Sequence, residues 1–291
     1  MLVGAVSGMG LVLLSALGFG GLDAVRKRLS AKMAPEPLVA LLGLGQAPFF
    51  VAFWVMIEGA ALPSAGYALP ACISVGLNLA ANLLYVQALR LSPLSLTVPF
   101  LALSPVFAAL GAFVVLGERL SIAAWSGLGM VVLGALLLVR RPGPRLWRAL
   151  RSEPGSPRMV AVAACWAVST SVDKVALEHA PVGLHALVQS GGVGLSLLLM
   201  LALRRRLGEL RIPRGERRYG LLLVVLASLA LGLQLLALRT VAVGLLEAVK
   251  RALGTFMAFV LGHVAFGERP RGAQWVAMVL LVTGVLLLLL A

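Results

Sequence analysis

The sequence is poor in charged residues. Asp, Glu, Lys and Arg make up only 12% of its 291 positions, whereas soluble globular domains carry about 25%. Hydrophobic residues supply 60% of the chain, and the mean hydropathy is +1.01. A water-soluble protein of this length would not be so apolar, so the composition excludes an ordinary soluble fold and indicates an integral membrane protein.

Cysteines and patterns of catalytic residues are scarce as well. The two cysteines, Cys72 and Cys165, both lie inside apolar runs, which predicts buried thiols rather than a disulfide framework. The sequence shows no metal-ligand cluster, no glycine-rich nucleotide loop and no nucleophile–base spacing. We therefore expect no cofactor, no bound metal ion and no enzymatic activity.

Acidic residues are fewer than basic ones, 11 against 25, and the formal net charge is +14. In a soluble chain this excess would suggest nucleic-acid binding. Here the basic residues stand mostly between apolar runs, and no basic stripe is interleaved with aromatic residues. We therefore expect no nucleic-acid partner. The first apolar run starts without a preceding basic segment, so we expect no cleavable signal peptide.

Long apolar runs recur along the whole chain, each long enough to cross a hydrocarbon core of roughly 30 Å. They predict ten transmembrane helices, which span residues 3–22, 37–57, 69–89, 93–116, 121–139, 159–176, 182–203, 219–238, 243–266 and 272–290. Only two predicted connections are long, at residues 140–158 and 204–218, and both are too polar to insert into a bilayer.

The two halves of the chain resemble each other at an offset of 150 residues. The matches include GER at 117–119 and 267–269, Trp125 and Trp275, and Asp23 and Asp173. Such matches are rarer coincidences than paired leucines, so we infer an internal duplication. Each half holds five predicted helices, an odd number, so the two repeats must have opposite orientations in the membrane. Inverted repeats are typical of secondary transporters, whose substrate site lies at the repeat interface.

A family resemblance agrees with this architecture. The stretch ALRLSPLSLTVPFLALSPVFAALGAFVVLGERLS, residues 88–121, resembles the fourth-helix signature of the EamA family in the drug/metabolite transporter superfamily. The resemblance implies ten helices in a 5+5 arrangement and alternating access through a central cavity, but no particular substrate. We therefore predict a first five-helix repeat over 1–140, a basic linker over 141–157 and a second five-helix repeat over 158–291.

Basic residues are divided very unevenly between the two predicted sides. Loops after odd-numbered helices hold 20 Lys and Arg residues, and loops after even-numbered helices hold three. Because basic loops stay in the cytoplasm, this bias predicts that both termini lie outside. The family resemblance points the other way, since many members keep both termini inside. We expect a multi-pass protein of a bacterial inner membrane and adopt the orientation that the charges favour.

One predicted span carries three charges close together. Residues 245–254 have the sequence LLEAVKRALG, with Glu247, Lys250 and Arg251 inside the ninth predicted helix. Lys250 lies 17 residues before Gly267, where this helix is predicted to end, which is about 25 Å along the helix axis. Burying each charge at this depth costs on the order of 2.5–3.5 kcal/mol, so the cluster predicts either a function or internal pairing.

Two interpretations of this cluster stay open. In the first, Lys250 and Arg251 project about 100° apart and form two walls of a pocket for an anion, because the guanidinium of Arg251 matches a carboxylate or phosphate. In the second, Glu247 pairs with one of the two cations and the cluster only holds the protein together. The segment VKRALG also resembles the ninth-helix lysine–arginine pair of sugar-phosphate translocators, which implies phosphate contacts at Lys250 and Arg251. Those translocators carry a further lysine in the fourth helix, and this chain has none there.

Polar residues in two other spans predict a cavity lining. Asn78, Asn82 and Tyr85 fall on one face of the third predicted helix. Gln234 occupies the position of the eighth helix that matches Tyr85. These four side chains are expected either to contact the substrate or to join helices by hydrogen bonds.

Prolines and titratable residues complete the candidates. Pro99 and Pro105 each remove a backbone donor from the fourth predicted helix, which predicts a hinge or a static kink. His263 is a candidate proton-coupling group, or else a packing residue. Asp23 and Asp173 stand at matched predicted helix ends beside basic residues, and we expect them to form interfacial salt bridges or a gate rather than to bind substrate.

Together these features predict an all-α membrane transporter that moves a small organic anion, or a phosphorylated metabolite among such anions, by alternating access. The alternative is an exporter of amino acids or other neutral or zwitterionic metabolites, with Glu247, Lys250 and Arg251 as an internal salt-bridge cluster. The expected partners are the substrate, the lipid bilayer, and a counter-substrate or a proton. An intramembrane enzyme that acts on a lipid phosphate is disfavoured, because that chemistry gives no reason for an inverted duplication.

Overall fold

The computed structural model describes residues 2–92, 98–139, 154–266 and 272–290, and every regular element among them is helical. The α-helices are α1 (Leu2–Ser30), α2 (Pro35–Met56), α3 (Ala68–Leu91), α5 (Ser104–Leu116), α6 (Ile122–Val139), α8 (Gly155–His179), α9 (Val182–Leu203), α10 (Arg217–Leu238), α11 (Val243–Phe266) and α12 (Gly272–Leu290). Short 3₁₀ helices are η1 (Val98–Leu103), η2 (Leu207–Leu210) and η3 (Arg214–Glu216).

Six of these helices, α1, α2, α3, α8, α9 and α10, are long and apolar enough to cross a membrane by length and composition. Three further apolar segments, Phe100–Leu116, Ile122–Leu137 and Trp275–Leu290, are shorter. The described residues therefore confirm an all-helical protein with several membrane spans. That all ten helices cross the bilayer stays a prediction.

The first helix is longer than predicted. Its apolar run ends near residue 22, but α1 continues to Ser30, so the loop predicted at 23–36 is wrong over much of its length. Val25 and Leu29 are buried on one face of this extension, and Nε of Arg28 lies 2.8 Å from Oε2 of Glu216. Buried apolar contacts and an ion pair therefore continue the helix beyond its hydrophobic run.

The fourth predicted span is not one continuous helix. Residues 93–97 lie outside the described residues, η1 follows, and α5 begins only at Ser104. Pro99 stands in the first turn of η1 and Pro105 in the first turn of α5. Their missing N–H groups fall where a helix has no acceptor for them, so neither proline kinks the interior of a helix. A hinge between η1 and α5 stays a prediction.

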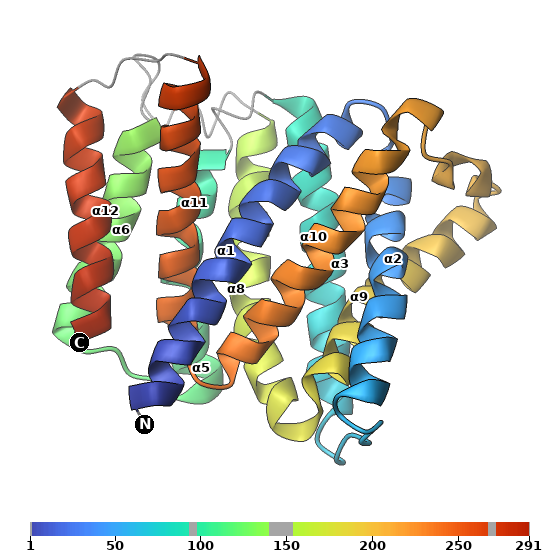
Figure 1. Ribbon diagram of the computed structural model, residues 1–291, viewed down its shortest axis with the longest axis horizontal. Helices are drawn as coiled ribbons and strands as arrows, with labels where there is room; N and C mark the ends of the chain where they lie inside the picture. Colours follow the sequence, from blue (N-terminus) through green and yellow to red (C-terminus); the bar gives the residue numbers. More distant parts are fainter. Residues whose placement is uncertain (1, 93–97, 140–153, 267–271, 291) are drawn as a thin grey trace.

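The two repeats pack around a two-fold relationship. The helix pairs with the most extensive contacts include α3 with α8 and α1 with α10, and exchanging the repeats turns one of these pairs into the other. The pairs α2 with α9, α6 with α12 and α5 with α11 map onto themselves. In Figure 1 α6 runs upward and α12 downward, and α2 and α9 likewise run in opposite directions. The repeats are therefore inverted relative to each other.

Matched glycines bring α6 and α12 close together. A Cβ atom on Gly127 would lie 2.7 Å from the carbonyl oxygen of Gly284, and a Cβ atom on Gly134 would lie 2.8 Å from that of Ala277. At the offset of 150, Gly127 corresponds to Ala277 and Gly134 to Gly284. The two close approaches are thus one contact made twice by the repeat, and they depend on small residues that let the backbones meet.

Both chain termini lie on one side of the molecule, and the arginine-rich connection between α9 and α10 lies on the other (Figure 1). The fold thus separates the termini from this basic connection, as the distribution of Lys and Arg predicted. Which side faces the cytoplasm stays a prediction.

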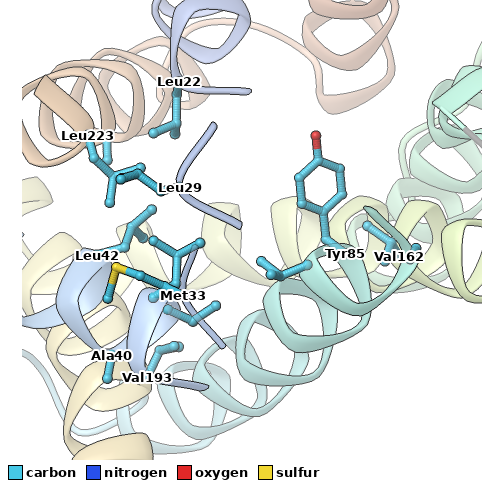
Figure 2. Close-up of a cluster of buried hydrophobic side chains, with 14 of the residues drawn as sticks. Leu22, Leu29, Met33, Ala40, Leu42, Tyr85, Val162, Val193 and Leu223 are labelled. Atoms are coloured by element: carbon cyan, nitrogen blue, oxygen red, sulfur yellow. The ribbon is translucent and has the colours of Figure 1, made fainter. Parts of the chain in front are cut away.

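A hydrophobic core packs beside the interface of the repeats. Leu22 and Leu29 of α1 are buried with Leu42 of α2 and Leu223 of α10 (Figure 2). In the same view the ring of Tyr85 projects from α3, with its hydroxyl directed away from that helix. The aliphatic packing fixes α1 against α2 and α10, and so determines where the polar side chains of α1 and α3 lie.

Candidate functional site

A cavity of about 480 Å³ lies between the two repeats, within the usual size range of small-molecule pockets. Side chains of α1, α2, α3, α8, α9, α10 and α11 line it. The lining includes all the predicted substrate contacts and the predicted charge partner, namely Asn78, Asn82, Tyr85, Gln234, Lys250, Arg251 and Glu247. The structure brings these residues into one site, and their contact with a substrate stays a prediction.

Lys250 is held by the protein itself. Its Nζ atom lies 2.6 Å from Oε1 of Glu247, one helical turn earlier, and 2.6 Å from Oε1 of Gln234 in α10. Glu247 is 1% exposed and also accepts a hydrogen bond from Oγ1 of Thr170 at 3.3 Å. Opposite charges and added hydrogen bonds of this kind allow a carboxylate and an ammonium group to be buried together.

Arg251 points in another direction. Its Nη2 atom donates to Oγ of Ser104, at the start of α5, over 3.2 Å, whereas Lys250 reaches α10. Successive residues of a helix project about 100° apart, so the tandem cations contact different walls of the cavity, as the sequence predicted.

The first repeat contributes a second set of charges. Nη2 of Arg26 donates to Oδ1 of Asn82 over 3.1 Å, and Nη1 of Arg26 lies 3.7 Å from Oδ1 of Asp23. Of the Asp23 side chain 42% is accessible, and this side chain lines the cavity. The expectation that Asp23 ends a helix at the interface is wrong, because α1 continues past it and directs it into the protein.

Asp173, the matched aspartate, is buried at the wall formed by α3, α8 and α9. Its Oδ1 atom accepts hydrogen bonds from Oγ of Ser74 and from Nε2 of Gln189, the latter over 2.8 Å, and lies 3.2 Å from Nε2 of His185. An interfacial position was also wrongly expected for this residue. Since α8 continues to His179, Asp173 lies within the helix and lines the cavity.

The asparagines of α3 both line the cavity and join helices. Nδ2 of Asn78 donates to Oγ of Ser169 in α8 over 2.6 Å, and Asn82 accepts from Arg26 of α1. Of the two roles that the sequence left open for these amides, the joining of helices is confirmed, and contact with a substrate stays a prediction. Hydrogen bonds across helices hold the amides in place at the cavity wall.

Aromatic side chains supply an apolar part of the lining. The rings of Tyr85 and Trp166 lie 5.2 Å apart between centroids, and Nζ of Lys250 lies 4.9 Å from the centroid of Phe19. All three rings line the cavity. An ammonium group at this distance from an aromatic face gains a cation–π attraction, so Phe19 also contributes to holding Lys250.

Comparison with known proteins identifies this scaffold. The profile of the EamA-like transporter family matches residues 6–140 and again residues 155–290. The chain belongs to the EamA-like transporter family. A solved structure described as "Crystal structure of protein" has a similar fold, with a TM-score of 0.76 and 21% sequence identity over 98% of this chain and 96% of that chain. No curated protein matches the chain. The protein is therefore a membrane transporter of the drug/metabolite type with two repeats.

The charges around the transporter's cavity do not cancel. Among the described residues, the charged lining consists of Asp23, Asp173 and Glu247 on one hand and Arg26, Lys27, Lys250 and Arg251 on the other. Formally this leaves an excess of one positive charge. The excess comes from the first repeat, which contributes Arg26 and Lys27 against Asp23.

The predictions from the sequence missed two residues that line the cavity, Arg26 and Lys27, and one that bonds a lining residue, His185. Arg26 and Lys27 were assigned to a loop, because the hydrophobic run of the first helix ends before them. His185 was overlooked although it stands four residues before Gln189, on the same face of a predicted span. That spacing of two polar residues in an apolar helix was the signal that would have found His185.

The remaining candidates are placed less fully. His263 belongs to α11, but its side chain lies outside the described residues, as does that of Pro99. Pro105 is buried at the start of α5, next to the serine that accepts from Arg251. The roles of these three residues stay predictions.

Proposed function

We propose that the transporter moves a small organic anion across the membrane by alternating access through the cavity between its repeats. The observation that carries this proposal is the formal excess of one positive charge among the described residues that line the cavity. Charge inside a membrane protein is costly unless another charge compensates it. A monoanion that enters the cavity supplies this compensation.

Arg251 takes the main contact with the anion in this proposal. Lys250 lies next to it and bonds Glu247 and Gln234, each at 2.6 Å. The planar guanidinium of Arg251 matches the geometry of a carboxylate or phosphate, and its bond to Ser104 shows that its side chain extends toward α5. A substrate oxygen then replaces or joins the serine hydroxyl as an acceptor.

The rest of the substrate is expected to be apolar. Phe19, Tyr85 and Trp166 line the same cavity as the charges, and aromatic faces bind flat apolar groups well. An aromatic carboxylate therefore combines the two chemistries of the cavity. Benzoate is the simplest probe of this class.

A second candidate substrate is an amino acid, which agrees with the alternative drawn from the sequence. The observation that favours it is the accessibility of Asp23, 42% of whose side chain is exposed where it lines the cavity. This carboxylate offers a site for an ammonium group, while Arg251 receives the carboxylate of the same molecule. The net charge of the cavity then stays uncompensated, so we rank this candidate second.

Ligand-induced thermal stabilisation tests the proposal. The purified transporter is heated with benzoate, inorganic phosphate, leucine or choline, because a ligand that binds only the folded state stabilises it, by about 2.7 kcal/mol at a concentration of 100 times Kd. We expect benzoate to stabilise the wild type and to have no effect on Arg251→Gln. Arg204→Gln, an identical change at an exposed residue after α9, is the matched control and keeps the response.

The other ligands separate the candidates. Stabilisation by leucine without benzoate, lost in Asp23→Asn, would replace the anion by a zwitterion. Stabilisation by phosphate alone would keep the anion but contradict the apolar body. A response to choline alone would contradict both candidates, since a cation does not compensate a positive cavity.

A further inference from the structure

A chain of buried polar groups leads from the cavity toward the side of the molecule that carries both termini. Oδ1 of Asp173 lies 3.2 Å from Nε2 of His185, and Nδ1 of the same ring lies 3.2 Å from the hydroxyl oxygen of Tyr67. His185 is 0% exposed and Asp173 2%. Tyr67 directly precedes α3, whose first turn lies on the side of the termini (Figure 1).

The hydrogen bonds around this pair define a starting protonation state. Burial and the charge of Asp173 raise the pKa of the Tyr67 phenol, so Tyr67 keeps its proton and can donate it to Nδ1 of a neutral His185. Nε2–H of His185 then donates to Asp173, whose Oδ1 also accepts from Ser74 and Gln189. Three donors directed at one carboxyl oxygen favour an ionised carboxylate, which only accepts hydrogen bonds.

We propose that His185 and Asp173 form a proton-binding site, and that the transporter takes up one proton there together with its anionic substrate. The proton, supplied by water from the side of the termini, binds Nδ1 of His185. The resulting imidazolium donates from Nε2 to Asp173 and from Nδ1 to the oxygen of Tyr67, whose own hydrogen turns away. One N–H bond forms on the ring, and imidazole is the side chain whose charge ordinarily changes between pH 5 and 8.

The pair is directly connected to the cavity. Asp173 and Gln189 both line it, and Nε2 of Gln189 bonds Oδ1 of Asp173 over 2.8 Å. A positive charge gained by His185 is therefore attracted to an anion in the cavity, with little water between them to screen it. By linkage, an anion that favours proton uptake is itself bound more tightly once the proton is present.

The charged residues on the elements around the His185–Asp173 pair have hydrogen-bond partners of their own. Glu58 accepts from the backbone N–H groups at the start of α9, Lys174 of α8 bonds Glu118, and Glu247 of α11 bonds Thr170 of α8. On the α3 side the described titratable groups are Tyr67, which bonds the His185 ring, and Cys72, which lies near Tyr67. The His185 ring lies directly against the carboxylate, with 3.2 Å between Nε2 and Oδ1 of Asp173, so this ring is the place for the proton.

Ring ¹⁵N NMR of histidine-labelled transporter tests the site without any ligand. The chain has three histidines, so a spectrum of His185→Gln assigns the signals of His185. As the pH is lowered from 9 to 5, we expect these signals to change reversibly from those of a neutral ring protonated at Nε2 to those of an imidazolium. Asp173→Asn removes the negative charge beside the ring, so this change moves to lower pH. Asp23→Asn, the matched control in the other repeat, leaves the pH of the change as it is. Signals of His185 that stay constant over this range would overturn the proposal.

Coupling to the substrate is measured by calorimetry with benzoate in two buffers of different ionisation enthalpy. This coupling rests on the proposed anion transport. We expect the wild type to take up a proton when benzoate binds. His185→Gln should still bind benzoate but take up no proton. Equal uptake by both proteins, or release of protons, would overturn the coupling. If benzoate does not bind the wild type at any pH, the anion proposal fails and coupled uptake fails with it, while the NMR titration still decides whether His185 and Asp173 bind a proton.

Discussion

Asp23 and Asp173 are matched residues of the two repeats, yet 42% of the Asp23 side chain is accessible and only 3% of the Asp173 side chain is. Asp23 lies 3.7 Å from one nitrogen of Arg26, while Asp173 is surrounded by Ser74, Gln189 and His185. The repeat thus placed two carboxylates at equivalent points of an inverted scaffold and gave them different chemistry.

The difference comes from the neighbours of the two aspartates. At the offset of 150, His185 and Gln189 correspond to Pro35 and Val39, and neither offers a polar side chain. Conversely, Arg26 corresponds to Ala176. The contacts between backbones, such as those of the glycines in α6 and α12, follow the two-fold relationship, and the polar contacts do not. A duplicated scaffold therefore keeps its packing while its two halves specialise.

The largest effect is expected at the buried pair of the second repeat. Glu247→Ala leaves the ammonium group of Lys250 without its carboxylate, and breaking a buried pair in this way costs about 3 kcal/mol or more. Loss of thermal stability in detergent measures the cost. The double variant Glu247→Ala with Lys250→Met removes both charges and should recover much of the loss. A double variant as unstable as the single one would show that packing, and not charge, holds this cluster.

A smaller loss is expected at Asp173. Asp173→Ala removes the acceptor shared by Ser74, Gln189 and His185, and unsatisfied buried donors cost about 2 kcal/mol. Thermal unfolding of this variant beside Asp23→Ala measures the comparison directly. Equal losses in the two variants would contradict the contrast between the aspartates.

The symmetric packing predicts equal and still smaller losses. Gly134→Ala and Gly284→Ala, at matched positions of the repeats, each bring a Cβ atom against the backbone of the facing helix, and we expect each to cost about 1 kcal/mol. Gly129→Ala, on the same helix as Gly134 but with no atom within 4 Å of its Cβ position, is the control. Thermal shifts that differ strongly between the two contact glycines would break the two-fold description of α6 and α12.

The smallest effect on stability is expected at Asp23. Its side chain is partly accessible and its Oδ1 atom lies 3.7 Å from Nη1 of Arg26, so Asp23→Asn should change the free energy of unfolding by no more than about 0.5 kcal/mol. Its effect on ligands is the informative measurement: benzoate binding should be kept or strengthened, since a negative charge leaves the cavity. Weakened benzoate binding would show that Asp23 positions Arg26 or Arg251 for the anion.

Much of the fold follows from patterns that are local in the sequence. Apolar runs placed eight of the ten predicted spans within a few residues of the observed helices, because a bilayer-spanning helix must be apolar over about 20 residues. The predicted boundaries are wrong where a helix continues beyond its apolar run or begins inside one. Residues 23–30 of α1 are helical because Val25 and Leu29 pack into the core and Arg28 pairs with Glu216 of the other repeat, and no local pattern indicates these partners.

For the site, the sequence by itself determined which residues cost free energy to bury. Glu247, Lys250 and Arg251 lie in an apolar span, so they must have partners or a ligand. The duplication predicted that their site lies at the interface of the repeats. Only the tertiary structure decided how these charges are divided. Gln234 and Glu247 take Lys250, Ser104 meets Arg251, and His185 joins Asp173. These partners come mostly from other helices, far away in the chain, and hydrogen bonds depend on distances of a few ångströms that only the packed helices fix.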